Sequence, residues 1–231
     1  MIKRARLFIN DNEESIRISK TIEKELLENN FIIDNKNYDL GIAIGGDGAF
    51  LRMVKEASFN SNIYYIGIQE TIINSDNKSS RFYSLNEIVI RDKKLKVLKS
   101  DIKIDNDLLE KFMGDGIIIA TSHGSTAHNL SYGGSIVYNT FTSLQITPMG
   151  PINSKVYRTL FNSVIIPSNL EISIIPIDGY RSLIVTIDGE NNVYNNVDSI
   201  ITKIENKSIK CLRLSHYNFP EKINEKLLSS E

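Results

Sequence analysis

The sequence contains little of several features that would narrow its function. Cys211 is the only cysteine, which excludes an internal disulfide and a cysteine-rich zinc site and fits a reducing compartment. The net charge is -1, so no basic field favours a nucleic acid or an anionic membrane as partner. No apolar run is long enough to cross a bilayer, and residues 1–9 are charged without the apolar core of a signal peptide. We therefore expect a cytoplasmic protein with no nucleic-acid or membrane partner.

What is present in the first third of the chain is an alternation of strands and helices. The expected elements, in chain order, are a strand Ala5–Ile9, a helix capped by Asp11, a strand Asp39–Ile44, a helix from Ala49 to about Ala57 and a strand Ile63–Ile68. This order predicts a small parallel sheet covered by helices, a Rossmann-like α/β domain over residues 1–85. The stretch Thr71–Arg81 is mostly polar, so we expect a mobile loop there.

The rest of the chain consists of short strand-like runs separated by turn residues. The runs are Ile88–Ile90, Leu95–Ile104, Leu108–Met113, Ile117–Ala120, Val164–Ile166, Leu170–Pro176, Leu183–Ile187, Ser199–Ile204 and Ile209–Leu214. Consecutive strands joined by turns such as Asp188-Gly189 predict an antiparallel, sandwich-like β-rich domain over residues 86–215. Glu221–Leu228 is amphipathic, and we expect the last segment, residues 216–231, to pack back on the first domain.

One stretch carries the first indication of chemistry: Gly41 to Phe50, GIAIGGDGAF, where a strand passes into a helix through glycines. Bare backbone amides and a helix N-terminus at such a junction attract phosphate. The lysine of a P-loop is missing here. Asp47 would repel phosphate unless its carboxylate holds a metal ion or takes a proton from a substrate hydroxyl. The alternative is a plain glycine turn capped by Asp47.

A second group of glycines and hydroxyl residues follows in the β-rich half. Gly114-Asp115-Gly116 precedes an apolar strand that runs into the small and hydroxyl residues of Thr121–Ser131. Such residues at the end of a strand and the start of a helix can bind the phosphates of a nucleotide or let an adenine lie close. The alternative is an ordinary helix with Ser125 or Thr126 as its N-cap.

These motifs stand in the order found in the NAD kinase family, which the chain resembles from about Leu40 to Arg213. The GGDG motif is shared with a wider superfamily that includes diacylglycerol-type lipid kinases and phosphofructokinases. Three matches are more specific to NAD kinases: Ser84-Leu85-Asn86-Glu87, GSTAHNLSYGG from Gly124 to Gly134, and Ile146-Thr147-Pro148 with Tyr157-Arg158-Thr159.

The resemblance implies a role for each matching residue. Asp47 corresponds to the catalytic aspartate, which approaches the 2′-hydroxyl of the adenosine ribose of NAD. The phosphate-binding loop corresponds to Gly45, Gly46 and Gly48. The NAD-binding residues correspond to Asn86 and Glu87 on the adenosine part, Asp115 toward the nicotinamide end, and Thr126, Ala127 and Ser131 beside the adenine. The turn near the phosphate donor corresponds to Asp188 and Gly189.

The implied activity is phosphorylation of NAD by ATP to give NADP, in a homodimer or homotetramer. Phosphoryl transfer needs an oriented hydroxyl, a metal-bound donor and donors around the phosphates. Since neither glycine loop carries a lysine, we expect Mg²⁺ that arrives with ATP to supply most of the charge, with Arg158 and Arg181 as candidate cations. His123 and His128 lie five residues apart, which does not suit two ligands on one helical face, so no protein metal site is predicted.

The chain departs from the family pattern at several positions. The threonine after GGDG is Ala49, the tyrosine after GSTA is His128, and Thr121-Ser122-His123 stands in place of TPT. The GxLGF segment that follows the third strand is missing or reduced, and we expect residues 69–83 to order over the dinucleotide when it binds. Two alternatives to an active NAD kinase are a catalytically degenerate NAD-binding sensor and a lipid kinase of the same superfamily.

Overall fold

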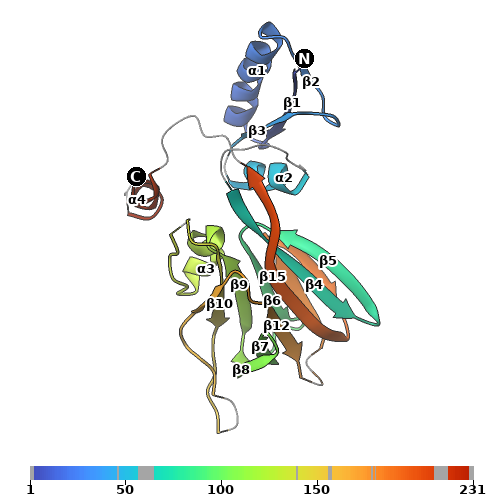
Figure 1. Cartoon of the computed structure of the whole chain (residues 1–231), viewed down its shortest axis with the longest axis vertical. Coiled ribbons are helices and arrows are strands. Elements are labelled where there is room, and N and C mark those ends of the chain that lie inside the picture. Colours follow the sequence, from blue (N-terminus) through green and yellow to red (C-terminus); the bar gives the residue numbers. More distant parts are fainter. Residues whose placement is uncertain are drawn as a thin grey trace. The chain divides into compact units, whose positions relative to one another are not determined.

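The chain forms two compact units, Met1–Asn62 and Ile63–Glu231. The structure is a computed structural model that describes residues 3–45, 47–56, 65–138, 140–155, 158–177, 179, 181–210 and 218–228. The predicted fold class, a mixed α/β domain followed by a β-rich antiparallel domain, is confirmed (Figure 1). The sequence predicted a boundary after residue 85, whereas the two units divide between residues 62 and 63. The reason is that the two strands between these positions, β4 and β5, pair within the second unit.

The first unit is built on a three-stranded parallel sheet in the order β2-β1-β3. Its elements are β1 (Lys3–Ile9), α1 (Glu13–Glu28), β2 (Phe31–Ile33), β3 (Leu40–Ile44) and α2 (Asp47–Glu56). The N-cap of α1 is Asn12 and not the predicted Asp11, because the Asn12 side chain accepts a hydrogen bond from the Ser15 amide at 2.8 Å. Ala5, Phe8 and Ile44 of the sheet are buried with Ala49, Met53 and Val54 of α2.

The second unit holds two six-stranded antiparallel sheets. One has the order β11-β10-β9-β6-β13-β14 and the other the order β5-β4-β15-β12-β7-β8. The strands of the two sheets are β4 (Tyr65–Ser75), β5 (Lys78–Ser84), β6 (Glu87–Asp92), β7 (Leu98–Ile104), β8 (Asp107–Gly114), β9 (Gly116–Thr121), β10 (Ser143–Met149), β11 (Val164–Pro167), β12 (Ile172–Pro176), β13 (Leu183–Ile187), β14 (Glu190–Tyr194) and β15 (Val197–Lys210).

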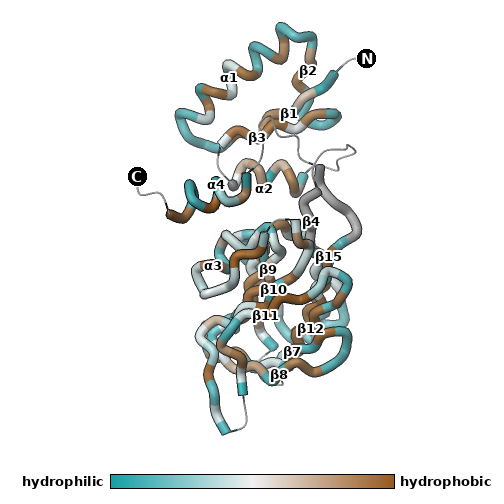
Figure 2. The backbone as a smooth tube through the Cα atoms, turned by 60° about the vertical axis from the view of Figure 1, so that its left-hand side comes forward, coloured by the Kyte–Doolittle hydropathy of each residue, from teal (hydrophilic) through white to brown (hydrophobic). Residues whose placement is uncertain are grey.

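The inner faces of these two sheets share one core. Ile88, Ile117 and Leu144 of the first sheet are fully buried together with Ile73 and Phe112 of the second. Figure 2 shows the hydrophobic colour along β9 and β10, in the middle of the first sheet. The predicted sandwich-like packing is therefore present, because apolar residues of both sheets alternate into a common interior.

The stretch expected to be a mobile loop is instead the hairpin of β4 and β5. Asp76 and Asn77 form its two-residue turn with φ of +49° and +59°, the left-handed values that such a turn requires. The polar residues of the stretch lie on strands that have one partly exposed face, while Ile73 points into the core. The expected ordering of a loop over residues 69–83 is therefore wrong as stated, since 69–75 and 78–83 are already paired strands.

The strand Ile63–Ile68, predicted to be the third of the parallel sheet, is also placed differently. Its described part begins at Tyr65 as the start of β4, which pairs antiparallel with β15 over its whole length. Apolar runs of this length fit either kind of sheet, so the pattern alone could not assign the partner.

The last residues that the structure describes are helical. α4 (Phe219–Ile223) continues into a single π-helical turn, η2 (Asn224–Leu228), and the Phe219 ring lies 4.5 Å from that of Tyr138. This segment belongs to the second unit, and its expected contact with the first domain stays a prediction. None of the helices in the described residues is long and apolar enough to cross a bilayer.

Candidate functional site

The glycine loop of the first unit follows β3 and leads into α2. Gly45 has a φ of +131°, and a Cβ built on it would lie 2.6 Å from Nδ2 of Asn10, so both backbone and space require glycine. Asp47 is the first residue of α2 and Gly48 the second. Gly46 and the Asp47 side chain lie outside the described residues. The predicted strand–loop–helix junction is therefore present, with a ten-residue helix starting at the loop.

Arg52, which was not among the cations predicted from the sequence, lies beside this loop. Arg52 of α2 donates from Nη2 to the Ile9 carbonyl at 2.7 Å and to Oδ1 of Asn10 at 3.1 Å. The same Asn10 side chain packs on Gly45. Arg52 follows Asp47 by five residues, and this position in the first turns of the helix was the signal that could have identified it.

The two cations proposed from the sequence lie in the second unit. The Nε of Arg181 donates to the Val197 carbonyl at 2.9 Å, and its guanidinium pairs with Asp198. Arg158 is exposed on the loop after β10. Arg181 therefore has a structural role in joining β13 to β15.

The Asn86–Glu87 pair at the start of β6 is held by the turn that joins β13 to β14. The carboxylate of Asp188 accepts hydrogen bonds from the backbone amides of Leu85 at 2.9 Å, Asn86 at 2.8 Å and Glu87 at 3.3 Å. In return, the Asp188 amide donates to the Glu87 carbonyl at 3.0 Å. Asp188 and Gly189 have φ of +45° and +86°, a tight hairpin turn of the predicted kind.

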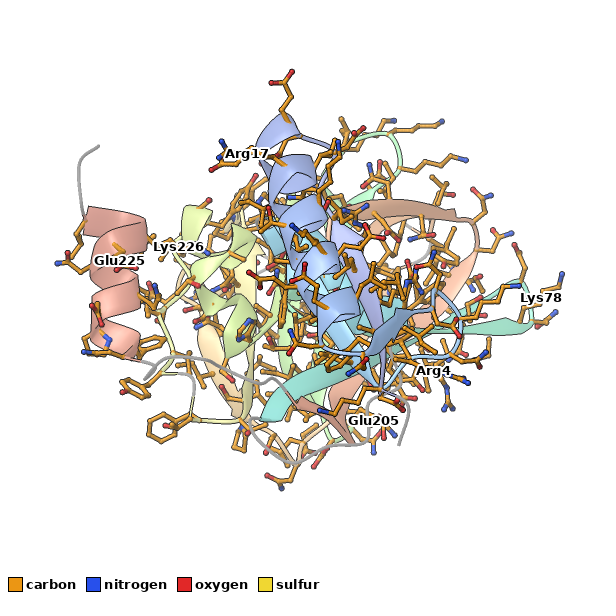
Figure 3. The ribbon with its side chains drawn as sticks, turned by 90° about the horizontal axis from the view of Figure 1, so that it is seen from above. Arg4, Arg17, Lys78, Glu205, Glu225 and Lys226 are labelled. Atoms are coloured by element: carbon orange, nitrogen blue, oxygen red, sulfur yellow. The ribbon has the colours of Figure 1, made fainter. Side chains whose placement is uncertain are left out.

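The Glu87 carboxyl is buried with one oxygen that accepts no hydrogen bond from the described residues. Its exposed fraction is 7%, and Oε2 has no hydrogen-bond partner among the residues that the structure describes. Burial, and after it the negative charge of Asp188, raises the pKa of Glu87 from 4.5 to about 7. Lys226 on the C-terminal helix, labelled in Figure 3, acts in the opposite direction and lowers this pKa. A buried carboxyl with an unused oxygen is suited to a ligand hydroxyl.

The segment after β9 lies directly against this pair. It forms η1 (His123–Thr126) and α3 (His128–Ser131), two short helices. The Thr121 amide donates to the Asn86 carbonyl at 2.8 Å, and Oγ1 of Thr121 donates to the Leu85 carbonyl at 2.6 Å. A Cβ on Gly124 would lie 2.1 Å from the Asn86 carbonyl oxygen. Because the two backbones approach this closely, Asn86 lies beside the segment that carries Thr126 and Ala127.

The hydroxyl residues of the segment do not cap a helix. Ser125 is fully buried, where its Oγ accepts from the Val137 amide at 3.1 Å, and neither η1 nor α3 has a side-chain cap. Asn129 is also buried and donates from Nδ2 to Oε1 of Gln145 at 2.5 Å, while its Oδ1 accepts from Thr147 at 2.6 Å. The alternative of an N-capped helix is therefore wrong, since these polar groups fix the segment to β10 instead.

Asp115 is not brought to the same place. It is exposed in the turn before β9, where its amide donates to the Met149 carbonyl at 2.8 Å and Gly150 leaves room for its carboxylate. Glu87 pairs with Ala120 at the far end of β9. At about 3.4 Å per residue, roughly 17 Å separates the two ends of this strand. The structure thus places the segment of Thr126 and Ala127 beside Asn86, with Ser131 exposed at the end of α3, and leaves Asp115 at the other end of β9.

Residues 85–209 match the model of the ATP-NAD kinase C-terminal domain. The chain belongs to the NAD kinase family. The NAD kinase of Finegoldia magna is 33% identical over 237 residues, which cover 84% of this chain and 86% of that protein.

Solved structures show the same fold. The yeast NADH kinase complexed with NADH superposes with a TM-score of 0.79 over all of this chain and 89% of that one, at 18% identity. The NAD kinase from Archaeoglobus fulgidus in complex with ATP gives a TM-score of 0.69 over 89% of this chain and 91% of that one, also at 18% identity.

The described residues include no group of three or more His, Cys, Asp or Glu side chains placed to hold a metal ion. The donor atoms that a Mg²⁺ ion prefers are oxygens, and a nucleotide's phosphates supply them.

Proposed function

We propose that this protein is an ATP-dependent NAD kinase, which phosphorylates the 2′-hydroxyl of the adenosine ribose of NAD to give NADP. One observation carries the proposal: Glu87, buried and with Oε2 unused, stands beside Asn86 against the closely packed Gly124 to Ala127 segment. A polar pair that needs a hydroxyl partner, next to small residues that admit a flat ring, fits an adenosine. The relatives named NAD kinase support the same reading.

In the proposed reaction, the ribose oxygen attacks the γ-phosphorus of ATP while the bond from that phosphorus to the bridging oxygen of ADP breaks. The hydroxyl proton passes to the carboxylate of Asp47. The amides of Gly45, Gly46 and Gly48 and the α2 N-terminus hold the phosphates, and Mg²⁺ arriving with ATP would neutralise the developing charge. Arg52 adds a fixed positive charge beside the loop.

We further propose that the protein is a cytoplasmic homodimer or homotetramer. Phe141, Phe161 and Ile165, around the edge strand β11, are 67%, 61% and 50% exposed, an apolar surface that a partner copy would cover. A neighbouring copy could also bring its Asp115 toward the nicotinamide end of the dinucleotide. Sedimentation that gives only a monomer at micromolar concentration would refute the assembly.

The proposed function is tested by incubating purified protein with NAD, ATP and Mg²⁺ and measuring NADP by an enzymatic cycling reaction. The matched variant is Asp47→Asn, which keeps the shape of the loop and removes the proton acceptor. We expect turnover to fall by about a hundredfold or more while NAD binding, measured by calorimetry, is unchanged. NAD binding by the wild type without any NADP formation would point to a sensor, and a fully active Asp47→Asn enzyme would remove Asp47 from catalysis.

A further inference from the structure

The resemblance to NAD kinases put Asp188 near the phosphate donor, but its contacts give it a different task. Both carboxylate oxygens are engaged: Oδ2 with the Leu85 amide, and Oδ1 with the amides of Asn86 and Glu87. These donors belong to three consecutive residues about a hundred positions earlier in the chain. A carboxylate that accepts several backbone amides is strongly held and has little capacity left for a ligand.

We propose that Asp188 is a positioning residue that holds the Asn86–Glu87 segment in its dinucleotide-binding geometry. This inference rests on the proposed function, since it assigns the supporting residue of the same site.

The geometry explains why a carboxylate is needed at this position. An unpaired run of three backbone amides at the start of β6 would carry a concentration of partial positive charge, and the ionised Asp188 neutralises it. The turn that carries this carboxylate is itself held in place. The Asp188 amide donates to the Glu87 carbonyl at 3.0 Å, and Asp188 and Gly189 have the left-handed φ values of a tight hairpin turn. We call the hydrogen bonds between Asp188 and residues 85–87 the Asp188 clamp. This clamp joins β6 to the β13–β14 hairpin.

The opposite side of the segment is held independently. Thr121 bonds both the Leu85 and Asn86 carbonyls, and Gly124 packs on the Asn86 backbone. The three amides of the segment thus face Asp188, while the carbonyls of Leu85 and Asn86 face Thr121. Loss of Asp188 would release one side only, so the variant should shift the Asn86–Glu87 side chains without unfolding the sheet.

The charge on Asp188 also acts on Glu87. Two charged groups influence this carboxyl: Asp188 from the β13–β14 turn and Lys226 from the C-terminal helix. Asp188 favours the protonated form of Glu87, and Lys226 favours the ionised form. Replacing the Asp188 carboxylate with an amide removes the repulsion, so the pKa of Glu87 falls.

The test compares Asp188→Asn with the wild type by measuring the dissociation constants of NAD and of Mg·ATP from pH 5.5 to 8.5. Because binding is the readout, the result does not depend on whether NADP is formed. For the wild type we expect NAD affinity to weaken as the pH falls through about 7, where Glu87 takes up its proton. In Asp188→Asn we expect about tenfold weaker NAD binding at pH 8.5 and a midpoint about one pH unit lower, with Mg·ATP affinity within twofold of wild type.

A matched control is Asp105→Asn. Asp105 also lies in a two-residue hairpin turn, has a φ of +47°, and accepts a backbone amide, that of Glu171 at 2.8 Å, but it stands in the β7–β8 turn. Its variant should leave NAD affinity and the pH midpoint unchanged. Glu87→Gln provides the second control, because it should abolish the pH dependence near 7.

Three results would overturn the proposal. Weaker Mg·ATP binding with unchanged NAD binding in Asp188→Asn would return Asp188 to the donor site. An unshifted pH midpoint would remove its effect on Glu87. Should Asp188→Asn fail to fold, hydrogen exchange of the wild type decides: the amides of Leu85, Asn86 and Glu87 should be protected without ligand, and fast exchange at all three would refute the clamp.

Discussion

Gly124 and Asn86 approach so closely that a Cβ on Gly124 would stand 2.1 Å from the carbonyl oxygen of Asn86. The obstacle is backbone and not the end of a flexible side chain, so it cannot move aside without displacing the strand start that carries Glu87. This single contact ties the segment that follows β9 to the residues that we assign to the dinucleotide.

The first prediction follows from that contact. Gly124→Ala should lower the free energy of unfolding by about 2–3 kcal/mol and weaken NAD binding at least tenfold, because the two backbones must separate. The measurements are urea denaturation and calorimetry. Gly133→Ala is the control: Gly133 has a φ of +77° but no atom within 4 Å of an added Cβ, so it reports backbone strain alone. Equal effects of the two variants on NAD binding would show that the clash is not responsible.

The second prediction concerns Arg52. Arg52→Ala removes the positive charge beside the glycine loop and the bonds to the Ile9 carbonyl and Asn10. We expect the KM for ATP to rise about tenfold and the KM for NAD to change less than twofold, because we propose that the loop holds the phosphates of ATP. Arg17→Ala on α1, an exposed arginine labelled in Figure 3, controls for loss of charge from the same unit. A selective rise in the KM for NAD would contradict the assignment.

The third prediction is a dependence of stability on pH. The folded state raises the pKa of Glu87 from 4.5 to about 7, so between these values it binds a proton that the unfolded chain has released. Stability should therefore fall as the pH rises from 4.5 toward 7 and beyond, by up to about 3 kcal/mol from this group. Denaturation of wild type and Glu87→Gln at pH 5 and pH 8 measures the effect as the difference between the two proteins. The same loss in both would assign it to other groups.

The fourth prediction concerns the buried network under α3. Asn129→Ala removes the bonds that it makes to Oε1 of Gln145 and to the Thr147 hydroxyl in a buried site, which should cost about 2–4 kcal/mol of stability. Chemical denaturation measures this cost. Asn191→Ala removes a comparable bond, from Thr186 at 2.6 Å, on an exposed strand, and should cost well under half as much. Similar losses in both variants would show that burial does not amplify the network.

The sequence predicted the fold class and most strands of the sandwich because their apolar residues alternate regularly. It did not predict β10, whose Gln145, Thr147 and Pro148 look unlike a buried strand until Asn129 is seen to satisfy two of them. The polar composition of residues 71–81 predicted a mobile loop and not the β4–β5 hairpin. The Asp76-Asn77 pair, which forms the hairpin turn, was the better indication of two paired strands.

The site was predicted in part. The segment that carries Thr126 and Ala127 lies beside Asn86, because Gly124 packs on the Asn86 backbone, while the NAD-binding roles of these residues stay a prediction. The roles of Asp188 and Arg52 depend on contacts across about a hundred and about forty residues, which no local pattern contains. Asp115, placed by resemblance with the same ligand, lies at the opposite end of β9.

The donors that Asp188 holds are main-chain amides, which every residue except proline possesses. Side chains at positions 85 to 87 can therefore be exchanged without changing the path of the backbone that presents them. For an engineer, this separates the support of the site from its selectivity: substitutions at Asn86 could be screened for altered nucleotide preference on a scaffold whose geometry is fixed from outside the varied segment.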